Sequence, residues 1–170
     1  MKTSRSGMKT CSKRTFAWVP VSLWLIVIFL FSAQNAEQSG NTSTGIVRWV
    51  VGLLYSGFEG FPPEKQAEIL HLFQLLVRKG AHFTEYAVLA MLVSNALRLA
   101  GKFRWKLPVI ISAAYAVTDE IHQYFVPGRA CRLLDVIIDT SGAAFGTAIF
   151  VLGLLHLKKR KDKRKPAQTE

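Results

Sequence analysis

The residues best suited to chemistry are polar side chains that interrupt otherwise apolar stretches in the second half of the chain. They are His82, Glu85, Asp119, Glu120, Gln123, Arg129, Asp135 and Asp139. Carboxylates beside a histidine can divide acid and base roles or hold a divalent cation. A divalent cation is therefore a possible cofactor, with Asp119, Glu120 and Asp139 as candidate ligands.

The apolar stretches predict membrane-spanning helices, along which the polar residues recur with helical spacing. Ionisable groups inside such helices are costly, so they usually face the bundle interior and have a function. The three polar stripes are His82, Glu85 and Tyr86; Asp119 or Glu120 with Gln123; and Asp135 with Asp139. A turn at Pro127 and Gly128 joins the helix that carries Asp119 to the helix that carries Asp135. Pro restricts φ and Gly accepts positive φ, as such a turn requires.

Gly142 and Gly146 lie on the same stripe as the two aspartates of the last helix. This small-xxx-small spacing predicts that another helix approaches that stripe closely. We therefore expect one outward-facing polar, acidic cavity, lined by five carboxylates, one or two histidines and Arg129. Arg78 and Lys79 are expected at its rim.

The composition favours a membrane protein over a nucleic-acid-binding one. Half of the 170 residues are hydrophobic and the formal net charge is +11, but basic and apolar residues occur in separate clusters. A nucleic-acid binder would interleave them on one soluble surface. Cys11 and Cys131 are the two cysteines, and the topology below puts them on opposite sides of the membrane, so no disulfide between them is expected.

The expected fold is all-α, a four-transmembrane-helix bundle. Its spans are residues 16–36, 81–99, 107–125 and 133–157. Basic residues occupy the tails 1–15 and 158–170 and the loop from Arg98 to Lys106. By the positive-inside rule both termini and this loop are cytoplasmic. The first apolar run also resembles a signal peptide, but its poor cleavage sites favour an uncleaved anchor.

The segment between the first two spans is expected outside the cytoplasm. Residues 37–44 read as a polar loop, and residues 46–58 as a helix too short to span, lying in the interface. Pro63 and Glu64 begin an amphipathic helix. Residues 78–80 are either a joint or part of one long helix that continues to residue 99.

The polar pattern resembles the VanZ-like family of bacterial membrane proteins over residues 16–157. The matching residues are Ser32, Gln34, Arg78, Lys79, His82, Glu85, Tyr86, Asp119, Glu120, Gln123, Pro127, Gly128, Arg129, Asp135, Asp139, Gly142 and Gly146. Some family members carry Asn where this chain has Asp139. The resemblance implies a multi-pass protein of the bacterial cytoplasmic membrane, with a role in the cell envelope or in glycopeptide (teicoplanin) resistance.

Several functions remain open at this stage. An enzyme would modify an envelope lipid or glycan with the residues above, and Lys79, Arg129 and Tyr86 would contact the substrate. A binding or shielding protein would use the same cavity without catalysis, and a small transporter is a further alternative. In a purely structural interpretation, Arg129 pairs with Asp119 or Asp135 and Gln123 with Asp139. The expected partners are membrane lipids and an envelope glycolipid or glycopeptide ligand; a homo-oligomer is possible, and nucleic acid is not expected.

Overall fold

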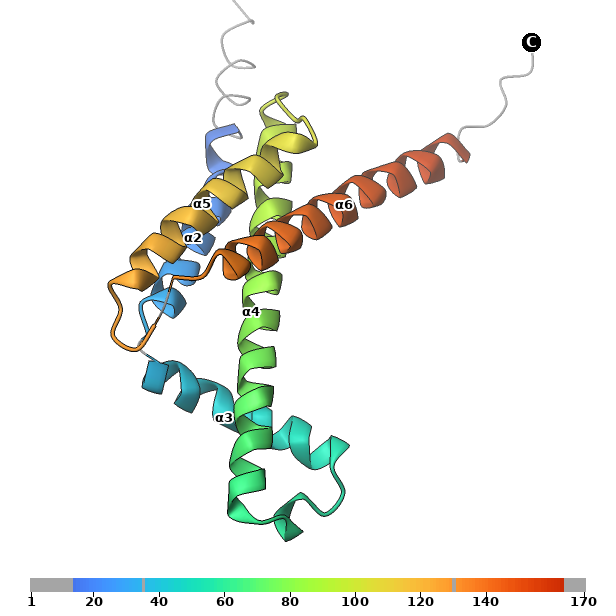
Figure 1. Cartoon of the computed structure of the whole chain (residues 1–170). Helices are drawn as coiled ribbons and strands as arrows, with labels where there is room; N and C mark the ends of the chain where they lie inside the picture. The colour runs from blue at the N-terminus through green and yellow to red at the C-terminus, as the bar shows by residue number, and fades with distance from the viewer. Residues whose placement is uncertain (1–13, 35, 130, 164–170) are drawn as a thin grey trace, which may run out of the picture.

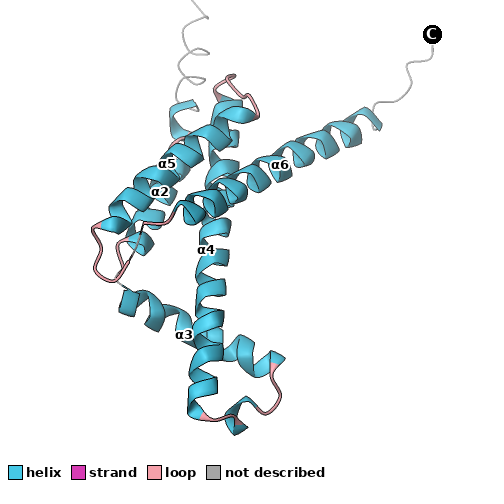
Figure 2. Cartoon of the chain, viewed as in Figure 1, coloured by secondary structure: helices cyan, strands magenta, loops and turns pink. Residues whose placement is uncertain are grey.

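The computed structural model describes residues 14–34, 36–129 and 131–163, with the backbone alone over 36–43. The expected tails therefore lie largely outside the described residues, as does Cys11. The helices are α2 (Val19–Ser32), α3 (Ala36–Leu54), α4 (Pro63–Leu99), α5 (Lys106–Tyr124) and α6 (Leu133–Lys163), with a 3₁₀ turn η1 (Phe58–Gly60). Within the described part there is no strand (Figure 2), so the all-α class is confirmed.

Helix α4 is the element on which the other helices pack (Figure 1). It begins at Pro63, with Glu64 in its first turn, where a carboxylate favours the positive end of the helix dipole. It runs unbroken through residues 78–80, so the question of a joint is settled in favour of one helix. Its 37 residues correspond to roughly 55 Å, far more than one membrane thickness. Gly101 follows its end with φ +71°, a backbone conformation that glycine adopts readily.

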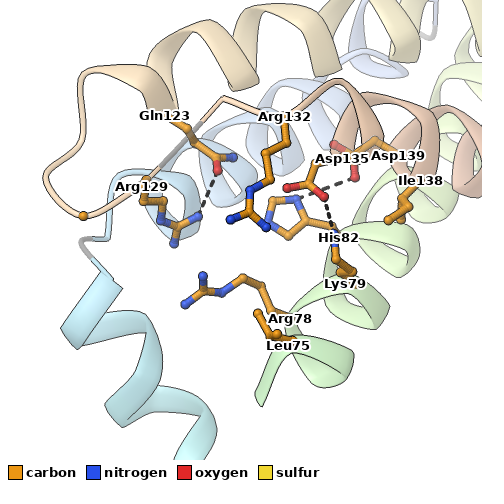
Figure 3. Close-up of a pocket in the computed structure, with 11 residues that line it drawn as sticks. Leu75, Arg78, Lys79, His82, Gln123, Arg129, Arg132, Asp135, Ile138 and Asp139 are labelled. Carbon is orange, nitrogen blue, oxygen red and sulfur yellow. Dashed lines mark hydrogen bonds and ion pairs between the residues drawn. The ribbon is translucent and has the colours of Figure 1, made fainter. Parts of the chain in front are cut away.

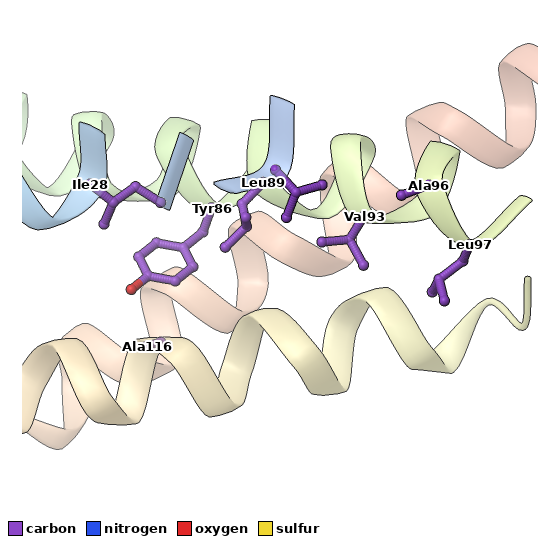
Figure 4. Packing of buried hydrophobic residues seen from close by; sticks show 8 residues of the cluster. Ile28, Tyr86, Leu89, Val93, Ala96, Leu97 and Ala116 are labelled. Carbon is purple, nitrogen blue, oxygen red and sulfur yellow. The ribbon is translucent and has the colours of Figure 1, made fainter. Parts of the chain in front are cut away.

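The C-terminal half of α4 forms the main core with α2 and α5. Figure 4 shows Tyr86, Leu89 and Val93 facing Ile28 and Ala116. Two hydrogen bonds to backbone carbonyls hold α2 in this core. The Trp24 indole donates to the Glu85 carbonyl at 2.9 Å, and the Tyr115 hydroxyl donates to that of Leu25 at 2.9 Å.

Helix α6 crosses α4 obliquely, and this pair makes the most extensive contact between helices (Figure 1). Gly142 and Gly146 are buried where the two helices cross. A Cβ atom on Gly142 would overlap the carbonyl oxygen of Phe83, and one on Gly146 would overlap that of Ala87. The close approach predicted from the small-xxx-small spacing is confirmed.

The segment between the first two spans differs from expectation. Residues 37–44 are helical and belong to α3, so the predicted polar loop is wrong. Helix α3 packs Val47 and Val51 against Phe58 and the N-terminal half of α4. Burial of an apolar stripe on one part of a helix stabilises the whole helix, including a segment whose residues form helices weakly. Ile46 and Trp49 remain exposed on α3.

Two helices end at other residues than the predicted spans. Helix α2 ends at Ser32, four residues before the predicted end of the first span, and α6 continues to Lys163, beyond the predicted residue 157. Two helical stretches of the described chain, Arg14–Ser32, which includes α2, and Leu133–Lys163, which is α6, are long and apolar enough to cross a membrane. The four spans expected from the sequence stay a prediction.

We predict that Gly146→Ala destabilises the α4–α6 pair, because its methyl group would meet the Ala87 backbone. Overpacking of this kind costs about 1–3 kcal/mol. Unfolding of the purified protein in mild detergent would measure the loss. Gly153→Ala is the matched control, since nothing lies within 4 Å of its added Cβ atom. Equal stability of both variants would contradict the proposed close contact.

Candidate functional site

A cavity of about 130 Å³ lies between α4, α6 and the connection from α5 to α6 (Figure 3). Its polar lining residues are Arg78, Lys79, His82, Gln123, Arg129, Arg132, Asp135 and Asp139. Leu75 and Ile138 supply an apolar part of the wall. A buried water needs only 10–15 Å³ by a comparable measure, so the cavity has room for a polar group of several atoms.

The connection from α5 to α6 contains the turn predicted from the sequence. The Arg129 amide donates to the Val126 carbonyl at 3.1 Å, and Gly128 has φ +76°. With Pro127 and Gly128 as the two central residues, this is the arrangement of a type II turn. The turn directs the Arg129 side chain back toward the end of α2.

Arg129 connects the turn to two helices. Its Nε donates to the Gln34 carbonyl at 2.9 Å, and its Nη1 donates to Gln123 Oε1 at 3.1 Å. Its Nη2 lies 3.4 Å from the Phe31 carbonyl oxygen, which accepts a third bond. Gln123 Nε2 in turn donates to Asp119 Oδ2 at 3.1 Å. The expected pairing of Arg129 with an aspartate, and of Gln123 with Asp139, is therefore wrong, because Gln123 lies between Arg129 and Asp119.

The electrostatics of Arg129 reflect its crowded surroundings. Burial lowers the pKa of its guanidinium, and the nearby charge of Arg78 lowers this pKa further. The carboxylates of Asp119, Glu120 and Glu85 act in the opposite direction and raise it. Arginine starts from so high a pKa that the group remains positively charged at neutral pH.

Helix α6 brings its two aspartates to different partners on α4. Asp135 forms an ion pair with Lys79 at the partly exposed rim. One turn deeper, Asp139 Oδ1 lies 3.6 Å from His82 Nδ1. The Asp139 side chain is 1% exposed, and neither of its oxygens has a hydrogen-bond partner among the described residues.

Four of the predicted site residues do not line the cavity. Tyr86 lies in the apolar core, with its ring 6.3 Å from that of Tyr115. Asp119 is held by Gln123, while Glu120 accepts a 2.8 Å hydrogen bond from the Arg132 amide. The fourth, Glu85, lies on a separate shallow surface beside Trp24.

The expectation of a cavity lined by five carboxylates is therefore wrong. Two carboxylates line it, together with four basic side chains. One reason is that consecutive residues of an α-helix point about 100° apart, so Asp119 and Glu120 cannot share one direction. The other reason is Arg132, which sequence reasoning missed: its amide binds Glu120 and its side chain lines the cavity. Its signal was a second arginine in the same short turn as Arg129.

Two further histidines, His71 and His122, do not line the cavity. His122 lies outside the cavity, with its ring 4.7 Å from that of Phe29, and His71 is exposed on α4. Among the residues that the structure describes, no group of three or more His, Cys, Asp or Glu could hold a metal ion. The expected cation ligands Asp119, Glu120 and Asp139 thus do not form a common coordination site.

An all-helical fold with two helices long and apolar enough to cross a membrane, and with ionisable groups buried between helices, is typical of an α-helical membrane protein. The chain belongs to the VanZ/LLP1 family, which it matches over residues 17–155. Neither a curated protein nor a solved structure matches it. Proteins of the VanZ family are membrane-associated, and membership supports a general role in the cell envelope or in resistance.

We predict that Arg129→Gln destabilises the protein by about 2 kcal/mol, because hydrogen bonds from a charged donor each contribute about 1.5–3 kcal/mol. The variant would remove the side-chain donor to the Gln34 carbonyl oxygen and one donor to that of Phe31, which also accepts from the Gln34 amide. Unfolding in mild detergent would measure the change. Arg132→Gln is the matched control, since its side chain has no hydrogen bond in the described structure. Loss of stability in Arg132→Gln as large as that in Arg129→Gln would contradict this assignment.

Proposed function

We propose that this protein binds the phosphate-bearing headgroup of an envelope lipid in the cavity between α4 and α6. One observation carries the proposal: the guanidinium groups of Arg78 and Arg132 line the cavity, and neither has a hydrogen bond or an ion pair among the described residues. In Figure 3 both groups, with that of Arg129, point toward a common space. Arginine forks match phosphate oxygens in charge and geometry, so a phosphate would satisfy these donors.

The charge balance of the lining supports an anionic ligand. Four basic side chains face two carboxylates, and the ion pair with Lys79 already neutralises Asp135. Arg78 and Arg129 are both partly buried, and the charge of Arg78 lowers the pKa of Arg129, so the two guanidinium groups repel one another. An anion bound among them would remove that repulsion.

The apolar part of the wall favours a lipid over a free phosphate ion. Leu75 and Ile138 line the cavity beside the charged groups. An acyl chain could follow this apolar surface while the headgroup stays among the arginines, which is how a lipid would differ from a soluble phosphate.

We place the cavity at the extracytoplasmic face of a four-span bundle in the bacterial cytoplasmic membrane. Figure 1 supports this arrangement, since the start of α2, the basic α4–α5 loop and the C-terminal end of α6 lie toward one side of the molecule. The turn at Pro127 lies toward the other. With basic segments in the cytoplasm, the cavity would face outward, toward envelope lipids and glycopeptides.

Binding would be tested with the full chain in mild detergent and a short-chain phosphatidylglycerol, by titration calorimetry. We predict that Arg78→Gln combined with Arg132→Gln weakens binding at least tenfold, because each charge-assisted bond contributes about 1.5–3 kcal/mol. Added salt should also weaken binding of the unaltered protein.

Arg98→Gln is the matched control, since Arg98 bonds to Asn95 at the far end of α4, away from the cavity. A diacylglycerol with the same chains tests the need for phosphate, and inorganic phosphate tests the need for the chains. Equal binding of the diacylglycerol, or unaltered affinity in the double variant, would refute the proposal.

The membrane orientation is tested by labelling Cys131, which is exposed in the α5–α6 connection. In a Cys11→Ser background, we predict that a membrane-impermeant maleimide labels Cys131 in intact cells. The control replaces Lys161 by cysteine in a chain with both native cysteines changed to serine. Lys161 is exposed near the end of α6, and its replacement should react only after permeabilisation. The reverse pattern would place the cavity in the cytoplasm.

A further inference from the structure

The pair formed by His82 and Asp139 is not explained by anion binding. His82 lines the cavity, while Asp139 Oδ1 lies 3.6 Å from its Nδ1 and is shielded from solvent (Figure 3). Within the described residues the Asp139 oxygens have no hydrogen-bond partner, and neither does His82 Nδ1. A buried carboxylate without donors is costly. The geometry therefore assigns Asp139 to the imidazole beside it.

A carboxylate next to one imidazole nitrogen selects which nitrogen carries the proton. With Nδ1–H directed at Asp139, the lone pair is on Nε2, the nitrogen that remains for a ligand. Asp139 cannot move away easily, because the next turn of α6 places Gly142 against the Phe83 backbone. Asp139 is thus a positioning residue, and His82 is a base directed at the cavity.

This base lies in the same cavity as three guanidinium groups, those of Arg78, Arg129 and Arg132. Cationic donors around a phosphate stabilise the negative charge that develops on its oxygens during displacement at phosphorus. A nearby base can remove the proton from an attacking hydroxyl group. Together these groups supply what a metal-independent displacement at phosphorus requires.

We propose that the site hydrolyses a phosphodiester bond of a membrane lipid, with His82 as general base. This inference rests on the proposed headgroup binding and adds a reaction to it. No Ser, Thr, Cys or Tyr lines the cavity within the described structure, so the nucleophile is water rather than a side-chain hydroxyl or thiol.

The reaction balances with water as the sole co-reactant. Nε2 of His82 takes one proton from the water as its oxygen forms a bond to phosphorus. The bond between phosphorus and one of the two ester oxygens breaks, and that oxygen leaves with the electron pair. The protonated His82 then returns its proton to this oxygen. The products are a phosphomonoester and an alcohol, and His82 is regenerated.

The test incubates the purified full chain with vesicles of phosphatidylglycerol or phosphatidylethanolamine in ¹⁸O-labelled water. Mass spectrometry follows the released alcohol and the phosphomonoester, which should contain one ¹⁸O atom. We expect His82→Gln to lower kcat by at least about 10²-fold with lipid binding retained. His122→Gln is the matched control, because His122 lies outside the cavity and should be replaceable without loss of kcat.

The role of Asp139 is tested with kcat and KM measured separately, since a purely structural role would not change kcat alone. Asp139→Asn should lower kcat by about 10²-fold while KM changes by less than about twofold, and Asp139→Glu should recover part of the rate. Thermal unfolding of each variant checks that it is folded. If His82→Gln does not fold, the two Asp139 variants and the unaltered protein decide the outcome.

Lipid binding without any product from the unaltered protein would overturn the hydrolysis and leave the proposed binding function intact. Unaltered kcat in His82→Gln would do the same. Absence of lipid binding would overturn both proposals. Equal hydrolysis of soluble glycerophosphoethanolamine would show that the substrate need not be a lipid and would overturn that part of the inference.

Discussion

The architecture depends on one steric constraint, the crossing of α6 over α4 at two glycines. Gly142 and Gly146 leave no room for a Cβ atom against the carbonyl oxygens of Phe83 and Ala87. Apolar side chains gain little by leaving lipid, so helices in a membrane associate through close packing of this kind. The crossing also sets the rotation of α6, which points Asp139 at α4.

Arg129 provides the second constraint, at the end of the bundle where α2 ends. A helix leaves its last carbonyl groups without internal partners, and within a membrane protein those groups need donors. The guanidinium supplies donors to the Phe31 and Gln34 carbonyls and to Gln123. One side chain therefore closes the end of α2 and also forms a wall of the cavity.

The site divides into a cationic rim and a deeper acid–base pair. At the rim, the guanidinium groups of Arg78 and Arg132 have no hydrogen bond or ion pair within the described chain, which supports the proposed anion. In the deeper pair, Asp139 is shielded from solvent and has no hydrogen bond within the described residues, whereas His82 lines the cavity. The two proposals place binding and proton transfer on different residues, so variants can separate one from the other.

The sequence by itself determined the helical class, the turn at Pro127 and the close approach at Gly142, because residue size and periodicity act locally. It could not determine which polar groups share a cavity. Asp119 faces Gln123 rather than the cavity, and Arg132 joins the lining unexpectedly. Those outcomes depend on how each helix is rotated about its axis and on which neighbour covers it. Only the packing of all helices together decides them, and that packing turned an expected acidic site into a cationic one.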